Sequence, residues 1–261
     1  MEINFTHHQT AHCENGVVSN LMKHNGFKVS EPMVLKVNHA PAVTYRVMPG
    51  QIFKRFAKRT GIKIKKEKFK SPKQAKDRLD ENLKKDNPVG LQVGVYNLTY
   101  FPDEYRFHFN AHNLIVYGKE NDNYLISDPV METVTTLTSK ELEKVRFAKG
   151  AFAPNGHMYY PIDFPKELDI KTAIVKGIKN TCRDMLAPVP IVGIKGIRYT
   201  AKLIRKWPKS KGVKVANHYL GQIVRMQEEI GTGGGGFRYI YAAFLKTEVQ
   251  KQMLIIKWPL N

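Results

Sequence analysis

The hydrophobic pattern changes near residue 165, and this change most constrains the fold of the 261-residue chain. Before it, short polar turns separate runs rich in β-branched and aromatic residues, as in an antiparallel sheet: 89–96, 107–120, 121–129 and 132–138. After it, apolar side chains recur at helical spacing in 169–185, 193–206, 215–229 and 237–253. We therefore expect an α+β fold with an antiparallel sheet in residues 1–164, and an all-helical second half in 165–261.

Further elements are predicted from local signals in the first half of the chain. MVLKV at 33–37 favours a short strand, and the proline-containing stretch that follows favours a loop to residue 50. Basic helices are expected over 52–61 and from Ser71 to about residue 85, with an edge strand between them. Thr138 and Glu141 have the spacing of a capping box, which predicts another helix there, and MYYPIDF resembles a last strand.

Cysteine usage and hydropathy limit the setting of the protein. The chain has only two cysteines, Cys13 and Cys182, without disulfide or metal-ligand spacing. Cys182 lies in the middle of a predicted helix among apolar residues, so we expect it to pack against them and to have no chemical role. No apolar run approaches the roughly 18 residues of a membrane span, and the polar N-terminus lacks a signal-peptide core. We expect a cytoplasmic protein with no membrane span and no bound metal.

The net charge of +19 is concentrated in two segments. Residues 54–86 hold 14 Lys/Arg against 5 Asp/Glu, and residues 166–214 hold 13 against 3. Such surfaces attract polyanions or acidic proteins, although a solvated basic face without a partner is an equal alternative. Nucleic acid is a weaker expectation, because no zinc finger, RNP signature or aromatic-interleaved basic strand is present.

Cys13 lies in the stretch THHQTAHCENGVVSNLMKHNG at 6–26, where a loop becomes an amphipathic helix. Apolar residues recur at helical spacing from Val17 to Met22, and Gly26 follows as a stop signal. The unpaired N–H groups and the dipole of a helix N-terminus favour a thiolate, which is the nucleophilic form of cysteine. The alternative is a small cysteine buried on the core face of the helix.

A base for this nucleophile is found in AHNLIVYGKENDNYLISDP. His112 opens one apolar strand and Asp128 closes the next, eight and five residues from a turn at 120–123. In an antiparallel hairpin the two side chains come within reach, so Asp128 would orient the ring and leave its other nitrogen for the thiolate. A strand-end histidine beside a turn-forming Asp-Pro pair is the simpler interpretation.

Together these motifs resemble the papain-like cysteine peptidase superfamily and its domains that process bacteriocin leader peptides. They are more similar to the family named for the N-terminal domain of butirosin biosynthesis protein H, on the residues HCENGVVSNLMKHNG and NYLISDP. GIKGIRYTAKLIRKW at 193–207 and EEIGTGGGGFRYIYAAFL at 228–245 are similar to that family's helical companion domain.

This resemblance implies an acyltransferase with Cys13 as nucleophile, His112 as base and Asp128 as orienting carboxylate. The acyl group would come from an acidic acyl carrier protein, on its phosphopantetheine thioester, and would pass to an amine or hydroxyl of a small-molecule acceptor in specialised metabolism. The chain itself would bind no cofactor. The acyl group, the acceptor and the oligomeric state are left open.

The oxyanion donor departs from the papain-like pattern, which places a glutamine about six residues before the cysteine. Gln9 lies only four residues before it. His12, Asn15 and the backbone N–H of Cys13 are the other candidates for stabilising an oxyanion.

The glycine run at 231–236 precedes a helix and lets backbone N–H groups approach an anion or a carbonyl. It lacks the lysine of a Walker loop and does not follow a strand, and a flexible linker is its alternative. The resemblance favours a substrate-side wall formed by Glu229, Gly233, Gly234, Arg238 and Tyr241.

Two other function classes remain open from the sequence. A cysteine peptidase or amidase would use the same three residues with water as the acceptor. A basic module that binds nucleic acid or an acidic protein would have no need of the cysteine.

Overall fold

A computed structural model describes residues 3–38, 51–228 and 234–246 of the chain. The chain divides into two compact units. Unit 1 comprises Met1–Glu31 and Ile52–Leu168, and unit 2 comprises Pro32–Gln51 and Asp169–Asn261. The early segment Pro32–Gln51 is thus grouped with the helical segment that begins at Asp169.

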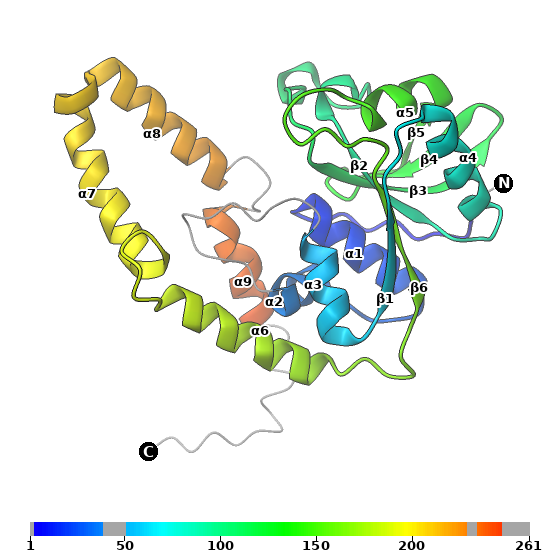
Figure 1. The fold of residues 1–261 in the computed structure, drawn as a ribbon, viewed down its shortest axis with the longest axis horizontal. Helices are drawn as coiled ribbons and strands as arrows, with labels where there is room; N and C mark the ends of the chain where they lie inside the picture. The colour runs from blue at the N-terminus through cyan, green and yellow to red at the C-terminus, as the bar shows by residue number, and fades with distance from the viewer. Residues whose placement is uncertain (1–2, 39–50, 229–233, 247–261) are drawn as a thin grey trace. The chain divides into compact units, whose positions relative to one another are not determined.

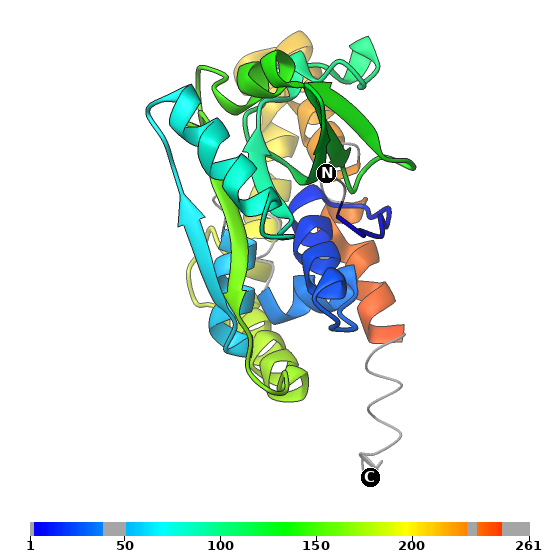
Figure 2. The ribbon, with the colours of Figure 1, turned by 90° about the vertical axis from the view of Figure 1, so that its right-hand side faces the viewer.

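Unit 1 is built on an antiparallel sheet, which confirms the predicted α+β class (Figure 1). Its strands are β1 (Lys63–Glu67), β2 (Val89–Val93), β3 (His112–Glu120), β4 (Asn123–Ser127), β5 (Thr135–Thr138) and β6 (Met158–Asp163). They lie in the order β1-β6-β2-β3-β4-β5. Figure 2 shows the β1–β6 pair side by side at one edge of this sheet.

Helices cover both faces of the sheet (Figure 1). On one face, α4 (Pro72–Leu83) and α5 (Ser139–Arg146) pack on a core that includes Leu91 of β2 and its partner Met158 of β6. On the other face lie α1 (Cys13–His24) and α3 (Gln51–Thr60). Successive strand residues point to opposite faces, so Gly90 and its partner Tyr159 face the α1 side.

The helix start signals operate as predicted. Thr138 and Glu141 form a reciprocal capping box at the start of α5. The Ser71 side chain accepts from the Gln74 N–H, and Pro72 occupies the first turn of α4.

The strand predicted at 33–37 is wrong, because these residues belong to the helix α2 (Glu31–Asn38). Pro32 is compatible with a helical first turn, and Glu31 is favoured there by the helix dipole. Met33, Val34 and Leu35 are buried, so packing overrides the strand propensity of this short apolar run. The predicted loop at 39–50 lies outside the described residues.

The β3 strand is shorter than the predicted run, because it begins at His112 instead of residue 107. The preceding segment contains the short 3-10 turns η1 (Val95–Asn97) and η2 (Asp103–Tyr105). The Asn110 amide donates to the carbonyls of Lys149 and Ala151 at 3.0 Å each, which fixes this loop in a non-strand conformation.

Unit 2 is helical, as predicted, in the part of it that the structure describes. Beyond α2 it contains α6 (Ile170–Met185), α7 (Gly193–Lys211), α8 (Val213–Glu228), η3 (Gly235–Phe237) and α9 (Arg238–Phe244). The α7 helix continues past Pro208 and ends at Lys211, and the positive φ of 81° at the following Gly212 suits a helix C-terminus. The last predicted helix extends to residue 253, and its end lies outside the described residues.

Across the described ranges, no helix is both long enough and apolar enough to span a bilayer. Within the same residues, no three His, Cys, Asp or Glu side chains gather as a metal site.

Candidate functional site

The loop that leads into Cys13 is held by a carboxylate from the first residue of α2. Glu31 accepts a hydrogen bond from the His12 N–H at 2.7 Å through Oε1, and one from the Ala11 N–H at 3.0 Å through Oε2. The Thr10 N–H donates to the Pro129 carbonyl at 2.6 Å. These three bonds fix the backbone of residues 10–12, directly before α1 begins, and so set the position of Cys13.

His12 is the N-cap of α1. Its Nδ1 accepts from the Asn15 N–H at 3.2 Å, which takes the place of a hydroxyl or carboxylate cap. Burial, together with the charge of His112, lowers the pKa of His12 to about 4. His12 is therefore neutral near pH 7, and its proton is on Nε2 because Nδ1 is an acceptor.

The structure brings Cys13, His112 and Asp128 together, and we call these three residues the Cys13 cluster. His112 Nε2 lies 2.6 Å from Asp128 Oδ2, and both side chains are buried. The Cys13 side chain interacts with the same ring, and this interaction contributes to raising the pKa of His112. Cys13 itself is partly exposed.

The hairpin that joins His112 to Asp128 follows the predicted turn. Glu120 pairs with Asn123, and the register shifts once between Val116 and Gly118. Asp128 is the first residue after β4, so it lies at the same end of the sheet as the start of β3.

Electrostatics favours the protonated form of His112. Burial alone would lower its pKa, but the charge and hydrogen bond of Asp128 and those of the Cys13 sulfur raise the pKa to about 10. An imidazolium held between a carboxylate and a sulfur is the arrangement that stabilises a thiolate. His112 therefore keeps its proton near neutral pH, next to the Cys13 side chain.

Asp128 has further partners that sequence reasoning missed. Tyr100 donates its hydroxyl to Oδ2 at 2.7 Å, and the Val130 N–H donates to Oδ1 at 3.2 Å. Burial and the charge of Asp128 hold the pKa of Tyr100 well above its usual value, so it remains a donor. Phe101 contacts the His112 ring edge-on at a centroid distance of 5.4 Å.

Asn113 also contacts the Cys13 sulfur, and sequence reasoning missed it. Its Nδ2 lies 3.8 Å from the Cys13 sulfur, within the range of an N–H···S hydrogen bond. Consecutive residues of a strand point to opposite faces of the sheet. His112 and Asn113 can both approach the Cys13 sulfur because they are the first two residues of β3, at the end of the sheet. A polar residue directly after the histidine, in an otherwise apolar strand, was the available sequence signal.

The predicted oxyanion residues occupy different environments. The Gln9 side chain is exposed, whereas the Asn15 amide is fully buried, with no hydrogen-bond partner among the described residues. The residue six positions before Cys13 is His7, whose ring nitrogens contact Ser127 Oγ at 2.8 Å and the Met131 carbonyl at 3.0 Å.

The predicted substrate-side residues belong to unit 2. Gly234 precedes η3 with φ 80°, and Arg238 Nη1 donates to the Gly235 carbonyl at 2.7 Å. Tyr241 stacks on Phe244 in α9, at a centroid distance of 6.1 Å. Glu229 and Gly233 lie outside the described residues.

Cys182 was expected to pack against apolar neighbours in α6. This expectation is wrong, because the residue is exposed. It lies on the solvent side of the helix.

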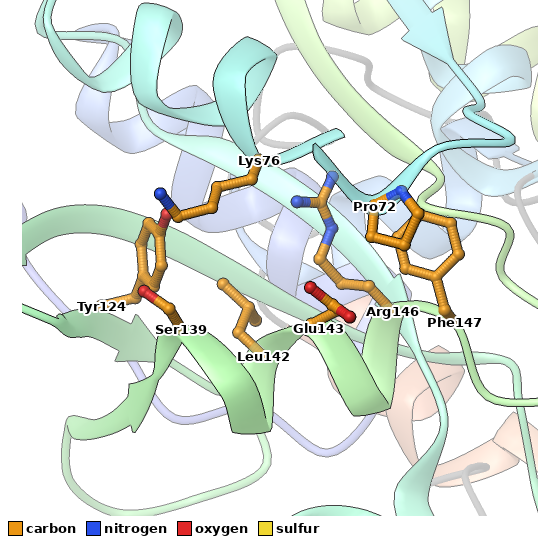
Figure 3. A pocket seen from close by; sticks show the side chains of 8 residues that line it. All are labelled: Pro72, Lys76, Tyr124, Ser139, Leu142, Glu143, Arg146 and Phe147. Carbon is orange, nitrogen blue, oxygen red and sulfur yellow. The ribbon is translucent and has the colours of Figure 1, made fainter. Parts of the chain in front are cut away.

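One cavity lies between α4 and α5, away from the Cys13 cluster (Figure 3). It holds about 250 Å³ of space, part of it open to solvent, and it is lined by Pro72, Lys76, Tyr124, Ser139, Leu142, Glu143, Arg146 and Phe147. Figure 3 shows the Lys76 side chain extending from α4 toward Tyr124. Arg146 donates to the carbonyls of Ala75 and Gly156 at 3.0 and 3.2 Å, so its main role is to join α5 to two neighbouring segments.

The cysteine at a helix start and the histidine at the start of a strand are arranged as the resemblance to papain-like cysteine enzymes predicts. Residues 12–129 match the family described as Butirosin biosynthesis protein H, N-terminal, which confirms the resemblance. Residues 140–253 match the family described as Domain of unknown function (DUF4872).

Two solved structures are similar to the chain. A C39-like peptidase from Bacillus anthracis is 14% identical with a TM-score of 0.46, over 64% of this chain and 100% of that one. The peptidase domain of Streptococcus ComA, a bifunctional ABC transporter of a quorum-sensing pathway, is 16% identical with a TM-score of 0.41. That likeness covers 60% of this chain and 98% of the other. No curated protein sequence matches the chain.

Proposed function

We propose that this protein is an acyltransferase that moves an acyl group from a carrier-protein thioester to an amine or hydroxyl of a small molecule, through an acyl-enzyme at Cys13. The observation that carries the proposal is the contact of the partly exposed Cys13 with a buried His112 that Asp128 holds at 2.6 Å. The match of residues 12–129 to this family supports acyl transfer over hydrolysis, since acyl transfer is the activity that the resemblance implies.

In the first half-reaction the Cys13 thiolate attacks the carbonyl carbon of the thioester. The new carbon–sulfur bond forms as the bond to the carrier's phosphopantetheine sulfur breaks, and His112 gives its proton to that departing sulfur. His112 is suited to this step because its pKa of about 10 keeps it protonated at neutral pH.

In the second half-reaction His112 must act as a base. Acylation removes the negative charge from the sulfur, which is one of the causes of the raised pKa of His112. The pKa therefore falls in the acyl-enzyme, although Asp128 still raises it, and the ring takes the proton from the attacking acceptor in its neutral form. Cys13 then leaves as a thiolate, and the starting state is restored.

The basic surface of α7 supports an acidic carrier protein as the donor. The cations of this helix are all exposed: Lys195, Arg198, Lys202, Arg205, Lys206, Lys209 and Lys211. Several of them recur every three or four residues, so they share one face. Among the described residues no ion pair neutralises any of these seven side chains, whereas several cations of α4 are paired, such as Lys73 with Asp77 at 3.1 Å.

Incubation with an acyl-loaded carrier protein is expected to place the acyl mass on the peptide that contains Cys13. The reason is that acyl-enzyme formation needs only the thiolate and the thioester, so the intermediate accumulates when the acceptor is withheld. Intact-protein and peptide mass spectrometry measure the adduct. Folded protein that never acquires the mass would contradict the proposal, and release of free acid as the main product would indicate a hydrolase.

Reversing two charges of α7, as in Lys202→Glu with Arg205→Glu, is expected to raise the KM for the carrier by roughly tenfold. The turnover at saturating carrier should change little, because these residues are not part of the Cys13 cluster. Steady-state transfer at low and high salt measures both values. Lys73→Glu with Lys76→Glu, which reverses two charges of α4, is the matched control, and an equal effect in both double variants would show that α7 has no special role.

A further inference from the structure

We propose that Asn113 is a fourth group of the reaction centre, which donates its Nδ2–H to the Cys13 sulfur and holds the thiolate in place. Nδ2 lies 3.8 Å from the sulfur, and the Asn113 side chain is buried. A donor in contact with sulfur stabilises its negative charge, and burial strengthens that effect. The inference deepens the proposed function, because it concerns the same nucleophile.

The orientation of the amide is fixed by its other partners. Nδ2 donates its second hydrogen to the Ala111 carbonyl at 3.1 Å, and Oδ1 accepts from the Tyr159 hydroxyl at 2.8 Å. Exchanging the oxygen and nitrogen of the amide would set the oxygen against both the carbonyl and the sulfur. The network therefore allows only the orientation in which N–H faces Cys13.

Tyr159 acts as a donor throughout the working pH range. Burial and the negative charges of Glu14 and Cys13 hold the pKa of Tyr159 well above its usual value. Its ring is held by Phe53 and His157, with centroid distances of 5.6 Å to each.

A glycine in the sheet makes this contact possible. Tyr159 belongs to β6 and Asn113 to β3, and β2 lies between these strands, where Gly90 pairs with Tyr159. A Cβ at Gly90 would lie 2.5 Å from Cε2 of the Tyr159 ring. Because Gly90 has no side chain, the ring can extend across β2 to reach the Asn113 amide.

The titratable groups around the sulfur are His112 on β3, Tyr159 on β6, and His12 and Glu14 at the start of α1. Asn113→Asp leaves all of them in place but adds a carboxylate, whose charge alone disfavours a thiolate. Tyr159→Phe adds no charge, so a displacement in both variants assigns the effect to the amide.

The test is the pH dependence of alkylation of Cys13 by iodoacetamide in the full-length protein. Asn113→Asp keeps an acceptor for Tyr159 but replaces the donor with a carboxylate. We expect its alkylation profile to move to higher pH, with a rate about tenfold or more below that of the parent on the acid side. Absorbance of the thiolate at 240 nm, referenced to Cys13→Ser, should show the same displacement.

Two further variants separate this role from a structural one. Tyr159→Phe keeps the ring but frees the amide, and it should displace the profile in the same direction by a smaller factor. Asn110→Asp changes another buried asparagine, which bonds to Lys149 and Ala151, and it should leave the profile unchanged. Coincident profiles for folded Asn113→Asp and the parent, or an equal displacement in Asn110→Asp, would overturn the proposal. Because no carrier protein is used, this test can fail while the acyl-transfer proposal stands. It can also succeed while the acyl-transfer proposal fails.

Discussion

Cys13→Ala is expected to lower acyl transfer by at least about 10⁴-fold while the protein stays folded. The substitution removes the sulfur that lies beside His112, which is the atom that forms the acyl-enzyme in the proposed reaction. The readout is transfer from an acyl-loaded carrier, together with loss of the mass adduct. Circular dichroism and thermal unfolding report on the fold.

Cys182→Ala is the matched control for this result. Cys182 is exposed on α6, so its removal eliminates a thiol without altering the Cys13 cluster. Its transfer rate should equal that of the parent. A Cys13→Ala protein that retains more than about one per cent of the rate would refute covalent catalysis at this residue.

Asp128→Asn is expected to lower transfer by about 10³- to 10⁴-fold. The amide cannot supply the charge that holds His112 protonated, and it can offer N–H where the ring needs an acceptor. The pKa of His112 should fall from about 10, which an NMR titration of the ring measures directly. An unchanged His112 titration in the variant would show that the carboxylate is not the cause of the raised pKa.

The same substitution should change how stability depends on pH. The pKa of His112 is about 10 in the folded protein against 6.5 for the free side chain, so its proton stabilises the fold fully below about pH 6.5. This contribution is lost as the pH rises from 6.5 through 10. Asp128→Asn should remove that part of the decline in stability.

Tyr100→Phe, which takes away one donor to Asp128 Oδ2 but keeps the charge, should lower the transfer rate much less than Asp128→Asn does, by roughly tenfold or less.

Local patterns accounted for the parts of the fold that depend on near neighbours. The capping box at Thr138 depends on residues three positions apart. The hairpin that brings His112 to Asp128 depends on one turn and the two strands beside it. The apolar run at 33–37 was misassigned because its burial depends on packing, which overrides the propensity of a five-residue segment.

The partners of the Cys13 cluster lay beyond sequence reasoning for a physical reason. Asn113 meets Cys13 across 100 residues of chain, and Tyr159 meets Asn113 across a strand that neither belongs to. Such contacts depend on strand order, which hydrophobic periodicity does not encode. Only the Cys13, His112 and Asp128 set could be anticipated, because the resemblance to a known family supplied the long-range pairing.

The carboxylate of Glu31 has a consequence for the backbone directly before the Cys13 helix. It accepts from the two peptide N–H groups, at Ala11 and His12, that would otherwise be available to an external anion. A side chain of the protein itself thus fills the anion position at these two residues. We therefore expect Glu31→Gln, which weakens both bonds, to loosen the loop that carries Cys13.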